Sequence, residues 1–240
     1  MELHIAKDPA QLSENLAAWI SNYILEVLQS QPRFSFVLSG GSTPKALYHL
    51  LAKEPYNVMI PWEKLDFFWG DERAVPFEDS RNNALMAYDT LLNHLPVQPE
   101  QIHVMRTDIK PEESAAAYEK LLEHYFKGSS KTFDLVLLGM GDDGHTLSLF
   151  PGTEVVNEKE AWVKAFFLPA QDMYRITLTA PVVNKAGCII FMATGNAKAL
   201  TMKSVIEGEY NPDLYPSQQI RPESGELHWF VDEAAAGAME

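Results

Sequence analysis

Short apolar runs alternate along this chain with segments whose apolar residues recur at helical spacing. Leu12, Leu16, Ile20 and Ile24 lie on one stripe of a helix that Asp8-Pro9 would begin. Further helices are expected at 44–51, 83–92, 112–126 and 197–206, and strands at 34–38, 65–69, 133–138, 162–167, 175–179, 188–193 and 228–231. Because parallel strands are joined through crossover helices, this order predicts an α/β fold. We expect a mainly parallel open sheet with helices on both faces, in a single domain over residues 1–240.

The first of these strands leads into a turn suited to binding an anion. It is followed by Ser39-Gly40-Gly41-Ser42-Thr43 and then by Pro44, which is favoured in a first helical turn, with Thr43 as the predicted N-cap. Glycines let the backbone approach a ligand, and a helix N-terminus offers unpaired N–H groups. The spacing is not that of a nucleotide P-loop, so a monophosphate is expected rather than ATP. The alternative is an ordinary capped turn.

A second glycine turn, Gly139-Met140-Gly141-Asp142-Asp143-Gly144, follows the strand at 133–138 and leads to His145. It matches the dinucleotide motif G-x-G-x-x-G, but it places two carboxylates where a pyrophosphate would bind. Pro151 would also interrupt the helix that should follow the motif before two helical turns are complete. We therefore reject that interpretation. A histidine beside two carboxylates at a strand end favours acid–base chemistry, with Asp142 or Asp143 orienting the ring. The alternative is a histidine that is only a satisfied polar group.

Two more strands end in loops of similar composition, Gly70 to Pro76 and Thr194 to Ala199. Since the carboxyl ends of parallel strands face one side, the four loops are expected to meet at one crevice. Arg73 and Lys198 would then be ligand-binding cations. The alternatives are a salt bridge between Arg73 and a neighbouring acid, and a solvated helix face for Lys198.

The charge balance limits the partners. With 33 acidic and 19 basic residues the net charge is −14, which disfavours nucleic acid and anionic membranes. An anionic ligand would need a local basic pocket, and its candidate residues are Lys45, Arg73, Arg81, Arg175 and Lys198. The single cysteine, Cys188, lies in an apolar run and is expected in the core, without a disulfide. Because no secretory signal or membrane-spanning stretch is recognisable, we expect a cytoplasmic protein.

Five blocks, in order along nearly the whole chain, together resemble the 6-phosphogluconolactonases. They are SGGSTP at 39–44, GDER-x-VP at 70–76, GMG-x-DGHT-x-SLFPG at 139–152, RITLT-x-P-x-x-N at 175–184 and WFVDEAAA at 229–236. Glucosamine-6-phosphate deaminases and isomerases resemble the chain in the first loop and in the DGH turn. Their expected continuation is a pattern like IAFNEP, whereas TLSLFP follows His145 here.

The resemblance implies a Rossmann-like fold similar to those of the deaminases and ribose-5-phosphate isomerase. It also implies hydrolysis of 6-phospho-D-glucono-1,5-lactone without metal or organic cofactor, with His145 as general base and Asp143 as its acidic partner. The implied substrate-binding residues are Ser39, Gly40, Gly41, Ser42, Thr43, Arg73 and Lys198, to which we add Arg175 and an asparagine. The family's Ser-Asn pattern is interrupted here as Ser80-Arg81-Asn82-Asn83. We expect Asn82 rather than Asn83 in that role, because Asn82 keeps the following helix in phase.

Lactone hydrolysis requires a positioned water, a base and donors for the developing oxyanion. The candidate donors are N–H groups of a glycine turn or Arg73. The sequence has no G-x-S-x-G elbow, so we expect no covalent catalysis. It has no H-x-H or H-E-x-x-H spacing either, so we expect no metal ion. Two alternatives remain, a sugar-phosphate isomerase or deaminase and a non-catalytic sugar-phosphate sensor. The expected partner is a small-molecule sugar-phosphate lactone, bound by a monomer.

Overall fold

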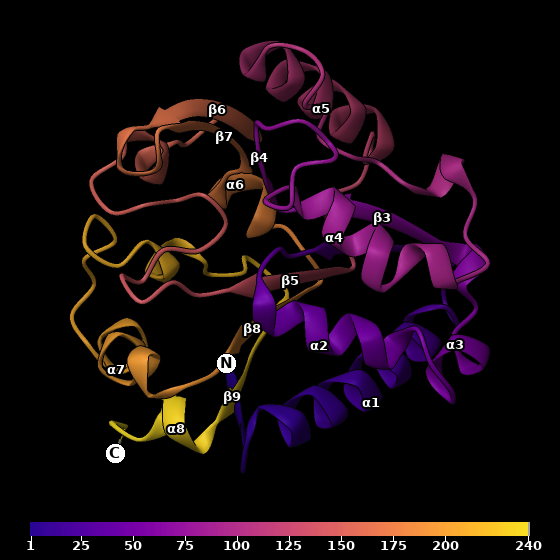
Figure 1. Cartoon of the computed structure of the whole chain (residues 1–240), viewed down its shortest axis with the longest axis horizontal. Helices are drawn as coiled ribbons and strands as arrows, with labels where there is room; N and C mark the ends of the chain where they lie inside the picture. The colour runs from indigo at the N-terminus through magenta and orange to yellow at the C-terminus, as the bar shows by residue number, and fades with distance from the viewer. Residues whose placement is uncertain (240) are drawn as a thin grey trace.

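A parallel sheet of six strands forms the centre of the computed structural model, which describes residues 1–239 (Figure 1). The strands, in spatial order, are β1 (Glu2–Ala6), β9 (Glu226–Asp232), β8 (Cys188–Ala193), β5 (Leu135–Gly139), β2 (Phe34–Leu38) and β3 (Leu65–Trp69). The predicted parallel sheet is thereby confirmed. Strand β1 was not predicted, because it is a half-exposed edge strand whose sequence, ELHIA, lacks a continuous apolar run.

A second sheet departs from the prediction. Strands β6 (Val163–Leu168) and β7 (Met173–Leu178) lie close to two predicted strands, but they pair antiparallel with each other and with β4 (Asp71–Arg73). Only Pro169–Gln171 and Asp172 connect β6 to β7, which is too short for a parallel crossover. The loop predicted after β3 therefore contains a strand, and the β4–β7 register places Arg73 opposite Arg175.

Helices cover both faces of the parallel sheet, as predicted. Along β2, Phe34, Phe36 and Leu38 pack toward α1 (Pro9–Val27), α2 (Ser42–Leu51) and α4 (Asn83–Thr90), whereas Val37 faces the opposite layer. That layer contains α5 (Pro111–Tyr125), α7 (Ala199–Ile206), α8 (Glu233–Ala236) and the small sheet. In Figure 1, α1 and α2 lie below β3 and β5, and α5 lies above them. Burial on both faces explains why the central strands are apolar throughout.

The remaining elements are short. Helix α3 is Tyr56–Met59 and α6 is Ala180–Val183, while a single 3₁₀ turn, Asn196–Lys198, precedes α7 where the sequence predicted helix. Cys188 is fully buried, as expected, and burial raises the pKa of its thiol. None of the helices formed by residues 1–239 is both long enough and apolar enough to span a bilayer.

A buried carboxylate ties the sheet edge to α5. Both oxygens of Asp66 accept hydrogen bonds from Arg33 at 2.6 Å, and the Tyr125 hydroxyl donates a third bond. Burial by itself raises the pKa of Asp66. The hydrogen bonds from Arg33 and Tyr125, together with His103, whose Nε2 lies 3.9 Å from Asp66 Oδ1, outweigh burial and hold this pKa well below its ordinary value of 3.8.

We expect Asp66→Asn to lower the free energy of unfolding at pH 7 by about 2 kcal/mol, because the charge-assisted hydrogen bonds of Asp66 are lost. The effect is no larger because Arg33 is half exposed and solvent screens its charge. A depressed folded-state pKa contributes stability above the ordinary pKa and loses it as the pH falls. The difference between parent and variant should therefore shrink below about pH 4 in urea titrations. Asp108→Asn removes the exposed ion pair between Asp108 and Arg106 and should change the free energy of unfolding little. Equal effects of the two substitutions would contradict the assignment.

Candidate active site

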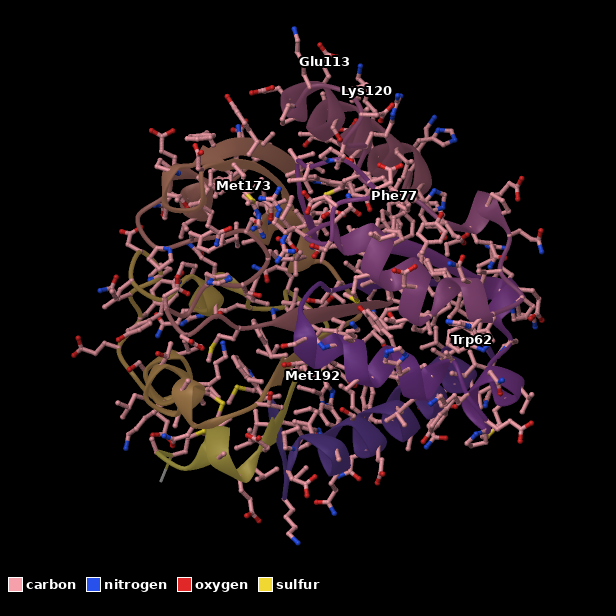
Figure 2. The ribbon with its side chains drawn as sticks, in the orientation of Figure 1. Trp62, Phe77, Glu113, Lys120, Met173 and Met192 are labelled. Atoms are coloured by element: carbon pink, nitrogen blue, oxygen red, sulfur yellow. The ribbon has the colours of Figure 1, made fainter. Side chains whose placement is uncertain are left out.

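A cleft with a volume of about 350 Å³ opens where β2, β5 and β8 end and where β4 follows β3. Four loops meet there, as the sequence predicts. The lining residues are Ser39, Gly40, Gly41, Ser42, Thr43, Pro44, Asp71, Arg73, Asn83, Gly139, Met140, Gly141, His145, Leu147, Arg175, Met192, Ala193, Thr194 and Lys198. Met192, labelled in Figure 2, marks the position of the cleft near the middle of the molecule.

The loop after β2 reaches the cleft through an early helix start. Helix α2 begins at Ser42, and its N-cap is Gly41 at φ 107°, a conformation that favours glycine. The predicted helix start at Pro44 with Thr43 as N-cap is therefore wrong. Ser42 and Thr43 instead occupy the first helical turn, where backbone N–H groups have no partner within the helix. The buried Tyr48 hydroxyl bonds to both the N–H and the C=O of Ser39 and holds the loop in place.

The turn after β5 holds His145 by its ring and by its backbone. The ring Nδ1 lies 2.5 Å from Asp143 Oδ1, which also accepts the His145 backbone N–H at 3.1 Å. The ring stacks on Phe150 with a centroid separation of 4.1 Å. A Cβ atom on Gly141 would lie 2.0 Å from Nδ1, so only glycine leaves room for the ring. Nε2 has no hydrogen-bond partner among residues 1–239 and is the nitrogen that remains for a ligand.

The two neighbouring aspartates have different partners. Burial raises the pKa of Asp143, but the hydrogen bond and the charge of His145 outweigh burial and leave this pKa below its ordinary value. An ionised Asp143 keeps the proton of the neutral ring on Nδ1 and leaves Nε2 free to accept one. Asp142 instead pairs with Lys198, whose Nζ lies 2.5 Å away. The structure therefore assigns the orienting contact to Asp143, and it draws Lys198 into the cleft wall rather than onto a solvated face.

Arg175 reaches the cleft from β7, but three of its five N–H groups already have partners. It is 4% exposed and donates to Asp71 at 2.7 Å, to Ser148 at 2.9 Å and to Gln171 at 2.9 Å. Burial raises the pKa of Asp71, but Arg175 and Arg73 outweigh burial and keep Asp71 ionised. Asp71 and Ser148 were missed as site residues. Both stand in the quoted sequence blocks, but only the fold shows that they share Arg175.

Arg73 has fewer hydrogen-bond partners than Arg175, the other arginine that lines the cleft. One of its terminal nitrogens, Nη1, donates to the Arg81 carbonyl at 2.5 Å, while its Nε is buried without a partner in the described chain. Its guanidinium forms no ion pair with Asp71 or Glu72, which was the alternative interpretation. Two other predicted cations do not line the cleft. Arg81 pairs with Asp79 at the surface, and Lys45 lies exposed on α2.

Asn83, not Asn82, faces the cleft, which corrects the prediction. Asn82 is the N-cap of α4, where its side-chain oxygen accepts the Leu85 N–H at 2.9 Å. Asn83 lies against Gly40, and its amide donates to the Asp71 carbonyl at 2.9 Å. The helix phase that favoured Asn82 was the wrong criterion, because a capping residue turns its side chain back onto the helix.

No group of three histidine, cysteine or acidic side chains close enough to share one ion lies at the cleft, within residues 1–239. The cleft cations are Arg73, Arg175 and Lys198. They line the same cleft as the first turn of α2, which adds N–H donors. This set of groups suits a phosphorylated ligand held at one point and a polar reaction at His145.

Comparisons with known proteins show the family and the fold of the chain. The family model described as glucosamine-6-phosphate isomerases/6-phosphogluconolactonase matches residues 7–229. A 6-phosphogluconolactonase of Nostoc sp. is 40% identical over 215 residues, which cover 88% of this chain and 86% of the relative. The solved 6-phosphogluconolactonase of Trypanosoma brucei is 28% identical with a TM-score of 0.87, covering 100% and 98% of the two chains. A monomeric glucosamine-6-phosphate deaminase shares the fold at 20% identity and a TM-score of 0.85, covering 99% and 100%.

Proposed function

Since the chain belongs to the family of glucosamine-6-phosphate isomerases and 6-phosphogluconolactonases, we propose that it hydrolyses 6-phospho-D-glucono-1,5-lactone to 6-phospho-D-gluconate, with His145 as general base. The observation that carries the proposal is the bond between Asp143 and His145 Nδ1 at the cleft. This bond leaves Nε2 without a partner among the described residues, at a cleft that Arg73, Arg175 and Lys198 also line.

The reaction needs two proton transfers at His145, one to the ring and one from it. Nε2 takes a proton from a water as the water oxygen attacks the lactone carbonyl, and Asp143 stabilises the imidazolium that forms. The ring then returns the proton to the departing ring oxygen, so the lactone opens to the acid without a covalent intermediate. A δ-lactone is an activated ester, and this assistance is sufficient without a nucleophilic side chain.

Charge develops on the carbonyl oxygen during the attack. The N–H groups of Gly141 and Gly144 already donate within their turn, to His145 and Gly141. The expected oxyanion donors were N–H groups of a glycine turn or Arg73. These two glycine N–H groups already have acceptors and are therefore not free to bind the oxyanion. Arg73 has a buried Nε without a partner and is the better candidate, either for the oxyanion or for the phosphate.

The 6-phosphate is proposed to bind at the first turn of α2, with Arg73 and Lys198 as its cations. Thr43 and Thr194 lie with their hydroxyls 3.3 Å apart, so the loops after β2 and β8 meet at this point. Their meeting brings N–H groups from α2 beside Lys198 of the neighbouring loop. Binding the remote phosphate would orient the lactone ring against His145.

A direct assay tests the proposal. The protein is mixed with freshly generated 6-phosphogluconolactone, and loss of the lactone is followed with correction for spontaneous hydrolysis. Faster hydrolysis, together with no ammonia from glucosamine 6-phosphate, is the expected result. Ammonia release without lactone hydrolysis would assign the chain to the deaminases. Tight phosphogluconate binding without either activity would make it a sugar-phosphate sensor.

The two adjacent asparagines give a matched pair of variants. Asn83→Ala should lower kcat/KM about tenfold, the effect of losing the one hydrogen bond by which the Asn83 amide, lying against Gly40, holds the Asp71 carbonyl of β4. Asn82→Ala should cost about 1 kcal/mol of stability through loss of the N-cap, with kcat/KM nearly unchanged. Steady-state kinetics and thermal unfolding separate the two effects. The reverse pattern would return the site role to Asn82.

A further inference from the structure

Two histidines and a glutamate gather at the end of the sheet opposite to the cleft. Glu2 and His4 belong to β1 and His228 to β9, and the parallel pairing of these strands brings the three residues together. The N-terminus lies beside β9 in Figure 1. His4 Nε2 lies 3.1 Å from His228 Nδ1, and one carboxylate oxygen of Glu2 lies 3.8 Å and 3.5 Å from these nitrogens. The proposed lactonase mechanism uses none of these groups.

The spacing fits a single small ion. The point equidistant from the three atoms lies about 2.0 Å from each, and zinc binds histidine nitrogen and carboxylate oxygen at about 2.0–2.2 Å. An ion slightly above the plane of the three atoms would keep these bond lengths and leave a fourth, tetrahedral position for water. Glu2 is exposed and His4 partly exposed, so an ion has access from solvent.

The surroundings orient the two rings. His228 Nε2 lies 3.1 Å from a carboxylate oxygen of Glu226, which holds a proton on Nε2 and leaves Nδ1 as a lone pair. Carboxylate–histidine contacts of this kind orient metal-binding histidines. The His4 ring stacks on Phe230 with a centroid separation of 4.2 Å, and His228 packs against Trp19.

We propose that Glu2, His4 and His228 form a binding site for one divalent ion of the zinc class, which joins the edge strand β1 to β9. The ion would replace the proton that the two histidine rings share. The site is structural, because it lies at the amino ends of the strands while the cleft lies at their carboxyl ends.

A second set of groups shares His228 and has to be distinguished. Cys188, Glu226 and His228 also lie within reach of one ion. Cys188 is fully buried in β8, so solvent does not reach its sulfur, whereas Glu2 and His4 are open to solvent. The exposed set containing His4 is therefore the one that the geometry favours.

The test titrates the chelator-treated full chain with Zn²⁺, and in parallel with Co²⁺, whose visible absorption reports tetrahedral coordination. We expect one ion per chain and a higher Tm with zinc. His4→Ala and the exposed Glu2→Gln should each weaken binding at least about tenfold, and Glu226→Gln by about 10- to 100-fold. His124→Ala, on the exposed side of α5, is the histidine control and should bind like the parent.

Several results would contradict the proposed zinc site. No zinc binding by the parent, or parent-like binding by His4→Ala and Glu2→Gln, would overturn it. Loss of binding in Cys188→Ala would place the ion in the other set and would overturn it as well. Lactone hydrolysis by the parent should be the same with zinc and with EDTA. Activity that depends on the ion would contradict the structural role, whereas absence of activity under both conditions would concern only the proposed function.

Discussion

His145→Ala is expected to reduce kcat for 6-phosphogluconolactone by roughly 10²–10⁴-fold, the usual contribution of a general base. Without the imidazole, no group of the cleft in the position of Nε2 can take the proton of the attacking water. Phosphogluconate should still bind, because the cations and the first turn of α2 are separate from the ring. Initial rates with correction for spontaneous hydrolysis, and calorimetric titration with phosphogluconate, measure the two effects.

Three comparisons make this prediction specific. Asp143→Asn should also impair turnover, because the amide cannot stabilise the imidazolium that Asp143 faces. Asp142→Asn removes the adjacent charge without touching the ring and should retain most of the turnover. His124→Ala should be indistinguishable from the parent. Near-normal turnover in His145→Ala would refute its assignment as the base.

The second large effect concerns the phosphate. Arg73→Ala or Lys198→Ala should lower kcat/KM for the phosphorylated lactone by about 10- to 100-fold, since charge-assisted hydrogen bonds to phosphate contribute roughly 1.5–3 kcal/mol each. Unphosphorylated gluconolactone should be a poor substrate of the parent. Its residual hydrolysis should scarcely change in the two variants, because it lacks the group that these cations bind.

The matched control is Lys45→Ala, which removes one positive charge from the exposed side of α2 outside the cleft. Kinetics on both lactones should leave this variant unchanged. Equal losses on both lactones in Arg73→Ala would move its role from the phosphate to the reacting carbonyl. A fall in Tm parallel to the activity loss would indicate instead that Arg73 acts on folding, through its bond to the Arg81 carbonyl.

Much of the parallel sheet follows from the sequence alone. Strands β2, β3 and β8 have the predicted bounds, because strands covered on both faces carry continuous apolar runs with clear ends. Strand β1 carries no such signal, since most of it is exposed at the sheet edge. The strand pair β6–β7 was visible as two strands, but a local pattern does not state which sheet a strand joins.

Within the site, composition and strand ends were enough to place the loop at 39–43, Arg73, His145 and Lys198 at one cleft. They could not separate adjacent residues of the same type. Asp142 and Asp143 differ only in which side chain each meets, Lys198 or His145, and Asn82 and Asn83 differ in the direction in which the start of α4 turns them. These differences depend on backbone direction, which a single residue does not determine.

The sequence by itself determined the alternation of strands and helices, the glycine turns at the strand ends and the histidine beside an acid, because these depend on residues close together in the chain. Only the tertiary structure decided which distant residues meet. Arg175 joins Asp71 through the register of β4 with β7, and His4 joins His228, 224 residues away, through the pairing of β1 with β9. No local spacing encodes such contacts, since they arise when strands far apart in the chain pair their backbone groups and bury their apolar faces.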